Sequence, residues 1–194
     1  VDRKARKATL KKFIFPEICP ECRSPVMQEE GQVALRCSNT LGCPAQLKGQ
    51  LKLYGSRSAM DIEGLWISLI DQLVDKGLVK DLSDLYGLRL NELAELERMA
   101  EKSARNLLYG IEASKKRELP RLIYALGIPD VGETTAEVLA WHYKDLDRLA
   151  EASEEELSKI HEIGPVVSHS IVSYFQNPAI RKVLLKLKQA DVRF

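Results

Sequence analysis

Residues 126–140 read LGIPDVGETTAEVLA, a glycine-containing turn that runs directly into a helical pattern. Gly127 and Gly132 stand five apart with Thr134 after them, which resembles the spacing of a phosphate-binding P-loop. That loop needs Lys where Glu133 stands, because an ammonium group neutralises nucleotide phosphates and a carboxylate repels them. The stretch therefore predicts a tight turn that opens a helix, and not a nucleotide site.

The same pattern occurs four times in the second part of the chain. Each copy has two apolar residues three apart, then a turn position and a helix start: DIEGLWISLIDQL, LERMAEKSARNLL, IPDVGETTAEVLA and IHEIGPVVSHSIV. The turn positions are Trp66, Ala100, Gly132 and Gly164, at intervals of 34, 32 and 32 residues. Such regular spacing indicates an internal repeat. Apolar residues recur three and four apart from residue 58 onward, which predicts a mainly α fold built as a compact bundle.

Each copy resembles a helix-hairpin-helix motif, which is a DNA-binding element. A tight turn that opens a helix exposes backbone N–H groups at the positive end of the helix dipole, so it can bind a phosphate without Lys. Glycine suits such a turn because positive φ costs nothing there and because no Cβ blocks the backbone. The alternative is a bundle whose glycines only cap helices. Since Trp66 and Ala100 replace glycine, we expect distorted or purely structural turns in the first two copies.

The predicted DNA contacts come from these turns, above all from the two that keep glycine. They are Gly64, Lys102, Ser103, Gly132, Glu133, Thr134, Gly164, Pro165 and Val166. Glu133 falls in a first helical turn, where carboxylates are common. Other nearby cations could add charge toward phosphates or could lie on solvated helix faces: Arg105, Lys115, Lys116 and Arg117. Trp141 and Tyr143 are expected to pack in the core.

All four cysteines lie within 25 residues, as Cys19, Cys22, Cys37 and Cys43 in the spacing C-x2-C-x14-C-x5-C. Two close pairs are typical of a four-cysteine zinc site. The intervening VMQEEGQVALR, with Glu30-Gly31 at its centre, predicts a β-hairpin that returns Cys37 toward the first pair. Two disulfides would be unusual in a cytoplasmic chain, and a redox pair would leave two cysteines unexplained. Because four thiolates leave no open position, the predicted zinc is structural.

Composition limits the class of protein further. The 194 residues are 45% hydrophobic with a net charge of +1, which is enough for a folded domain or two small ones. Residues 1–12 hold six Lys or Arg against one Asp. No stretch reaches the ~18 apolar residues of a membrane span, and no apolar signal core follows the basic segment. We expect a cytoplasmic chain and, since it starts at Val1, a fragment or a processed product.

Together these segments resemble the bacterial NAD-dependent DNA ligases. The similarity runs in order over residues 13–194 and includes FIFPEICPEC, RCSNTLGCPAQ, SRSAMDIEGL, KGLVKDLSDLYGL and ALGIPDVGE. It implies a four-cysteine zinc finger at 13–57, a helix-hairpin-helix domain of four repeats at 58–194, and the end of an OB-fold in 1–12. Arg23, Trp66 and Ala100 stand where the family usually has glycine.

The resemblance also implies a function. This part would grip nicked duplex DNA through backbone phosphates, while an absent adenylation region would use NAD and the Lys of a K-x-D-G motif to seal the nick. The chain has no Asp-Gly pair, so by itself it is not expected to be an enzyme or to bind NAD. Its expected partners are duplex DNA and the other ligase domains, in replication and repair of DNA damage. The alternatives are a stand-alone DNA-binding or repair scaffold and a purely structural, protein-binding domain.

Overall fold

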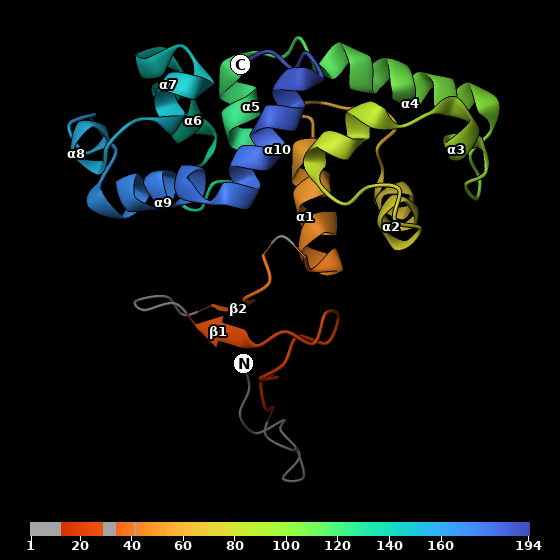
Figure 1. Ribbon diagram of the computed structural model, residues 1–194, viewed down its shortest axis with the longest axis horizontal. Helices are drawn as coiled ribbons and strands as arrows, with labels where there is room; N and C mark the ends of the chain where they lie inside the picture. Colours follow the sequence, from red (N-terminus) through yellow and green to blue (C-terminus); the bar gives the residue numbers. More distant parts are fainter. Residues whose placement is uncertain (1–12, 29–33, 41) are drawn as a thin grey trace, which may run out of the picture.

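The chain folds into a small strand-containing module and a larger helical body, as Figure 1 shows for the computed structural model. The structure describes residues 13–28, 34–40 and 42–194. The basic segment 1–12 and the predicted turn at Glu30-Gly31 lie outside these described residues. The fold is mainly α with one short β-hairpin, as the sequence predicts.

Strands β1 (Val26–Gln28) and β2 (Leu35–Cys37) pair antiparallel, with Val26 opposite Cys37. Helix α1 (Pro44–Tyr54) begins directly after Cys43, with proline in its first turn, where a missing N–H costs nothing. Three residues along α1 are buried in the core of the helical body: Leu47, Leu51 and Tyr54. The predicted division after residue 57 stays a prediction, because α1 contributes to both parts.

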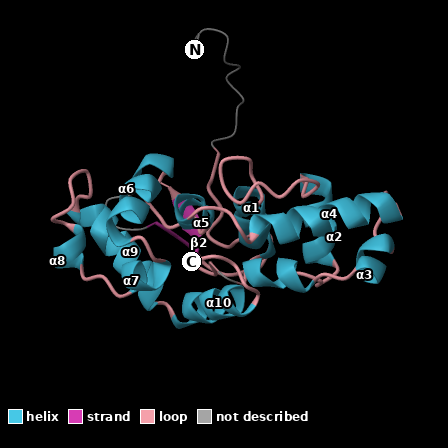
Figure 2. Ribbon diagram, turned by 90° about the horizontal axis from the view of Figure 1, so that it is seen from above, coloured by secondary structure: helices cyan, strands magenta, loops and turns pink. Residues whose placement is uncertain are grey.

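The helical body has two lobes on either side of three central elements (Figures 1 and 2). The first lobe contains α2 (Ile67–Asp75), the 3-10 helix η2 (Leu82–Gly87), α3 (Leu90–Ala94) and α4 (Glu101–Ser114). The second contains α6 (Glu133–Tyr143), α7 (Leu146–Ala150), α8 (Glu154–Leu157) and α9 (Pro165–Gln176). Between them lie α1, α5 (Leu119–Ala125) and α10 (Pro178–Gln189), with α1 packed on α5 and α10 on η2.

The two lobes repeat one arrangement of helix starts. Asp81 begins η2 and Asp145 begins α7, and each carboxylate accepts a hydrogen bond from a backbone N–H two residues later. Glu92 and Glu156 each accept from the backbone N–H at the start of a short helix, in α3 and α8. Both pairs of residues are 64 apart in sequence. The four sequence repeats are therefore two copies of a two-hairpin unit.

Helix α6 shows one error in the sequence prediction. Trp141 is 78% exposed and does not pack in the core. The helix buries the face that carries Ala136 and Ala140, whereas Trp141 lies on the other side, four residues after the exposed Glu137. Tyr143 is half-buried and packs against the core, as predicted.

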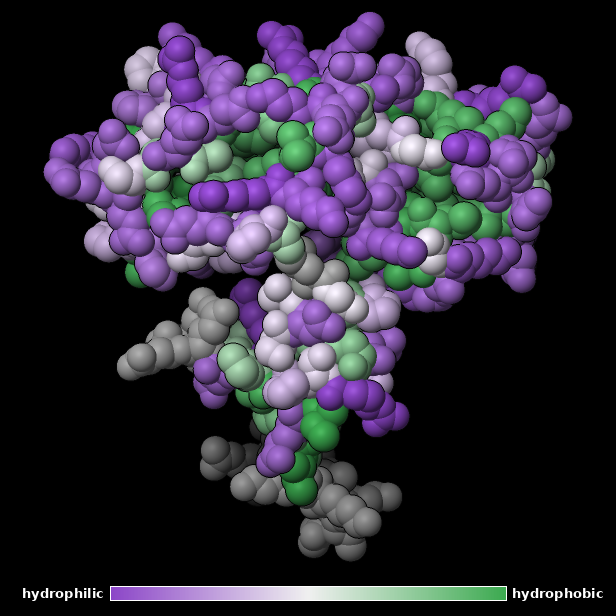
Figure 3. Space-filling model, in the orientation of Figure 1, coloured by the Kyte–Doolittle hydropathy of each residue, from purple (hydrophilic) through white to green (hydrophobic). Residues whose placement is uncertain are grey.

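The surface in the view of Figure 3 is mainly hydrophilic, with hydrophobic residues showing over the α2–α4 lobe. The core beneath is continuous from α1 to α10 and is built largely of Leu and Ile side chains. Within the ranges that the structure describes, no helix combines the length and the apolar character needed to cross a bilayer.

Helix α4 lies against the turn of the first hairpin at Gly110. A Cβ there would lie 2.9 Å from the carbonyl oxygen of Glu63 and 3.2 Å from its nitrogen. Gly110→Ala is therefore expected to lower the free energy of unfolding by about 1–3 kcal/mol in urea denaturation. Gly49→Ala in α1 is the matched control. A Cβ at Gly49 meets nothing within 4 Å, so better helix propensity should add ~0.5–1 kcal/mol. Equal changes in the two variants would contradict the close contact.

Candidate metal centre and nucleic-acid interface

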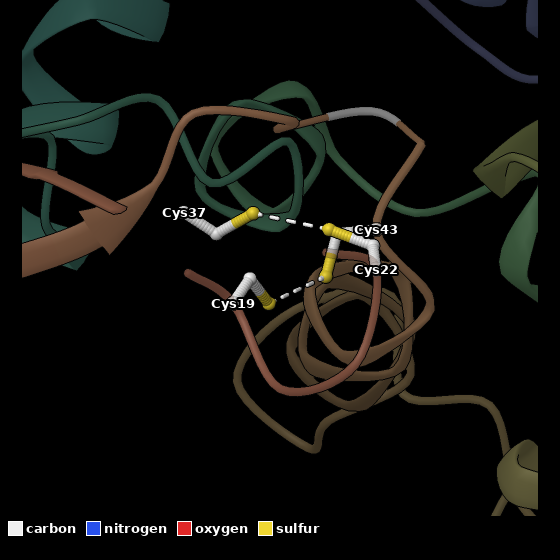
Figure 4. A group of neighbouring side chains, drawn as sticks. All are labelled: Cys19, Cys22, Cys37 and Cys43. Atoms are coloured by element: carbon white, nitrogen blue, oxygen red, sulfur yellow. Dashed lines mark hydrogen bonds between the residues drawn. The ribbon is translucent and has the colours of Figure 1, made fainter. Parts of the chain in front are cut away.

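The side chains of the four cysteines point toward one another beside the N-terminus of α1 (Figure 4). All four sulfur atoms lie within 4.8 Å of one another. The Cys19 and Cys43 sulfurs are 3.9 Å apart, and those of Cys22 and Cys37 are 3.3 Å apart. Tetrahedral zinc with Zn–S bonds of about 2.3 Å places its ligand sulfurs roughly 3.8 Å apart. The donor set and its spacing therefore fit a structural zinc ion.

Local structure places each ligand. The first pair lies in a tight turn in which the amide of Cys19 donates to Ser24 and the amide of Arg23 donates to Cys19, with Arg23 at φ 63°. Cys37 ends β2, and Cys43 is the N-cap of α1. The hairpin thus brings the third cysteine back to the first pair, as the sequence predicts.

The thiols differ in acidity before any metal binds. Hydrogen bonds with the side chain and backbone of Ser24 lower the pKa of Cys22 to about 6. Desolvation raises the pKa of Cys37 to about 12 and also raises that of Cys43, although amides in the first turn of α1 oppose the latter shift. Since the thiolate is the metal ligand, zinc binding must release protons from the less acidic thiols.

The four predicted hairpin turns have one backbone geometry. In each turn, the backbone amide of the residue just before the helix N-cap donates a hydrogen bond to a carbonyl oxygen. That oxygen belongs to the residue three positions earlier in the chain, at 3.1–3.3 Å. In each, the residue two before the N-cap has positive φ: 88° at Gly64, 60° at Arg98, 62° at Asp130 and 74° at Glu162. The first two turns are therefore not distorted by Trp66 and Ala100, and the expected distortion was wrong.

The helices that follow these turns all start without a side-chain cap. The N-caps of α2, α4, α6 and α9 have extended backbone and accept no hydrogen bond through a side chain. In α6 the first backbone hydrogen bond of the helix runs from the Ala136 amide to the Gly132 carbonyl oxygen at 2.9 Å. The amides of residues 133–135 therefore have no acceptor within the helix. Among the other helices, Asp81, Asp145, Ser153 and Asn177 cap theirs with side chains, whereas α1 and α5 also start without such a cap.

The conformational reason expected for the hairpin glycines is wrong. Gly132 has φ −89° and Gly164 has φ −81°, values open to any residue, because the positive φ falls two residues earlier. A Cβ built on either glycine would meet nothing within 4 Å. Nothing within the described fold therefore requires glycine at these positions. What remains is the second reason, close approach of an external group to the backbone.

The predicted contact residues surround these helix starts. Glu133 and Thr134 are exposed in the first turn of α6, as are Pro165 and Val166 in α9. Lys102 is exposed and Ser103 half-buried in the first turn of α4. Gly64 is half-buried against α4, close to Leu107. The predicted contact residues thus lie in separate groups, one at each hairpin turn.

A hydrogen bond joins the two glycine hairpins. The Ser170 hydroxyl on α9 donates to the Asp130 carboxylate in the third turn over 2.8 Å. The third turn is thereby tied to the helix of the fourth hairpin. This contact was not predicted from the sequence, because the two residues are 40 apart and neither has a distinctive local pattern.

Three of the nearby cations form ion pairs within the fold, among them Lys115, which pairs with Glu112 at 2.7 Å. Arg105 pairs with Glu101 at 2.6 Å, and Arg117 pairs with Asp61 at 2.7 Å. Arg121 was not singled out from the sequence. Its guanidinium donates to the Ala59 carbonyl oxygen at 2.7 Å and to that of Arg57. Arg117 and Arg121 together hold the loop that leads into the first hairpin.

Comparison with known proteins agrees with this arrangement. The family model of the NAD-dependent DNA ligase C4 zinc finger domain matches residues 19–45, and that of the helix-hairpin-helix motif matches residues 121–184. The chain is 52% identical over 187 residues to the DNA ligase of Methylococcus capsulatus, covering 96% of the chain and 28% of that protein. It is 50% identical over 181 residues to the DNA ligase of Halothermothrix orenii, covering 93% and 27%.

The fold and the cysteine cluster define a zinc-finger and helix-hairpin-helix region. In sequence the chain corresponds to this region of the NAD-dependent DNA ligases, whose C4 zinc finger domain it matches at residues 19–45. It spans just over a quarter of the length of the curated relatives that it matches.

Proposed function

We propose that this chain is the non-catalytic DNA-binding part of an NAD-dependent DNA ligase and grips duplex DNA on both sides of a nick. The backbone amides at the starts of the hairpin helices bind phosphate oxygens, and the helix dipole adds to the attraction. Such contacts carry no sequence information, which suits an enzyme that acts at any nick.

One observation supports this proposal above the others. Gly132 and Gly164 leave uncapped helix starts open to an external group, although neither φ nor packing requires glycine there. A glycine that served only as a cap would gain from a Ser, Thr, Asn or Asp side chain, which caps four other helices of this chain. A bound phosphate explains why glycine, and not a residue with a capping side chain, stands at these two N-caps.

The remaining assignments rest on the family. An adenylation region elsewhere in the ligase would use NAD and supply the catalytic lysine, and this chain would hold the DNA beside it. The zinc ion keeps the cysteine module folded and takes no part in the reaction. A zinc site of four thiolates and a DNA substrate suit the cytoplasm, where we place the protein, with roles in DNA replication and repair.

Binding to nicked, intact and single-stranded DNA of one sequence tests the proposal. Duplex affinity is expected to fall roughly 10- to 100-fold between about 50 and 200 mM salt, as for a small number of phosphate contacts. Tighter binding to nicked than to intact duplex is expected if the grip spans the break. Fluorescence anisotropy measures both quantities. Failure to bind any duplex at low salt would contradict the proposal and favour a structural domain that binds protein.

A further inference from the structure

A pocket lies beside the first hairpin, in the first lobe. It has a volume of about 380 Å³ and is lined by Glu63, Gly64, Trp66, Ser103, Asn106 and Tyr109. It lies between the turn that precedes α2 and one side of α4. Trp66 is 48% exposed and Tyr109 is 79% exposed, so both rings are accessible to a ligand. Pockets of this size with aromatic walls and a few polar groups are typical of ligand sites.

The second lobe has no aromatic residue at the corresponding positions. Gly132 takes the place of Trp66 at the helix N-cap. Counted from the N-caps of α4 and α9, Ser173 takes the place of Tyr109. Because the backbone geometry of the turns is shared, this difference in side chains changes what the first hairpin can bind and not how it folds.

Inside the pocket, the polar side chains favour a neutral group over a phosphate, while the amides at the start of α2 stay outside this comparison. Glu63 is exposed at the turn and forms no ion pair with any residue in the described ranges, so its carboxylate repels an anion. Asn106 contributes an amide and Ser103 a hydroxyl, and these neutral groups can both donate and accept hydrogen bonds. A flat ring with amino and carbonyl groups on its edge satisfies the aromatic walls, the amide and the carboxylate together.

We propose that this pocket binds an unstacked nucleobase of the DNA. The inference rests on the proposed function, which places the starts of α2 and α4 on the DNA-binding face. Bases stack on aromatic side chains regardless of sequence, and unstacking costs least where a nucleotide is unpaired or a strand is broken. The first hairpin thus recognises disrupted base stacking, while the second lobe holds continuous backbone.

The test uses the Trp141→Phe variant, in which Trp66 is the sole tryptophan. Its emission and the DNA affinity are measured with a nicked duplex that carries one unpaired nucleotide at the break, and with the same duplex abasic at that nucleotide. The base is expected to increase affinity roughly 5- to 100-fold over the abasic duplex and to quench Trp66. Tyr109→Ser, which copies the second lobe, is expected to reduce this preference while intact-duplex affinity stays within about twofold.

The possible failures can be told apart. Equal affinity for the two duplexes with unchanged Trp66 emission would overturn the base pocket while leaving the phosphate grip in place. Emission that responds to the other ligase domains and not to DNA would assign the pocket to a protein partner, which also overturns it. Loss of all duplex binding would instead reject the proposed function on which the inference rests.

Discussion

Replacing Gly132 and Gly164 together by alanine is expected to reduce duplex DNA affinity on the order of 100-fold or more. Each added Cβ would stand where a phosphate oxygen must approach the amides, and each lost charge-assisted contact costs roughly 1.5–3 kcal/mol. The fold should barely change, since neither Cβ meets another atom within 4 Å and both φ angles suit alanine. Anisotropy titration with nicked duplex measures the affinity, and urea denaturation measures the stability.

Gly87→Ala is the matched control for this double variant. Gly87 ends η2, away from the hairpin turns, and a Cβ there also meets nothing within 4 Å. It is expected to leave DNA affinity unchanged. The double variant itself should lower the free energy of unfolding by at most about 2 kcal/mol, since each of the two N-cap replacements costs up to roughly 1 kcal/mol. Unchanged affinity in the double variant would mean that these glycines do not mark phosphate sites.

The repeat and the cysteine cluster were predictable because each depends on spacing alone. Apolar residues at a constant offset from the four turn positions place every turn at the start of a helix. The close cysteine pairs could meet only if the segment between them folded back, and the β-hairpin between Val26 and Cys37 does so. Both inferences need only the order of residues along a short stretch of chain.

The geometry within the turns was not predictable in the same way. The left-handed residues are Gly64, Arg98, Asp130 and Glu162, of which only one is glycine. Their conformation follows from the backbone hydrogen bond that closes each turn before the N-cap. Three charged residues therefore adopt a positive φ there, although this conformation is unfavourable for residues other than glycine. From residue type alone, the positive φ was therefore assigned to the glycine that follows the turn.

Long-range polar contacts also escaped sequence analysis. Arg121 reaches the carbonyl oxygen of Ala59, 62 residues earlier in the chain. No local periodicity marks such a partner, because an arginine on a helix is usually a solvated side chain. The same holds for the pocket between Trp66 and Tyr109, which exists only after α4 has packed beside the first turn.

Removing zinc is expected to unfold the cysteine module while the helical body stays folded. In the described part of residues 13–43, the buried hydrophobic side chains are Cys19 and Cys43, so the module has no apolar core besides its metal ligands. Zinc binding contributes roughly 10–16 kcal/mol in comparable peptides, far more than a three-residue strand pair could supply. The core of the helical body begins at Leu47 and does not include the ligands. Helical content should therefore survive.

Hydrogen exchange measured by mass spectrometry, with and without a strong chelator, tests this expectation. Peptides from residues 17–28 and 34–40 should lose protection, while peptides from α4 and α9 should keep theirs. Cys37→Ser should reproduce the effect of the chelator without any treatment. Ser38→Ala is the control, because it removes only an exposed hydroxyl that donates to the Pro25 carbonyl oxygen at 3.0 Å. Unchanged protection of the module after complete metal removal would show that its hairpin, and not zinc, holds it together.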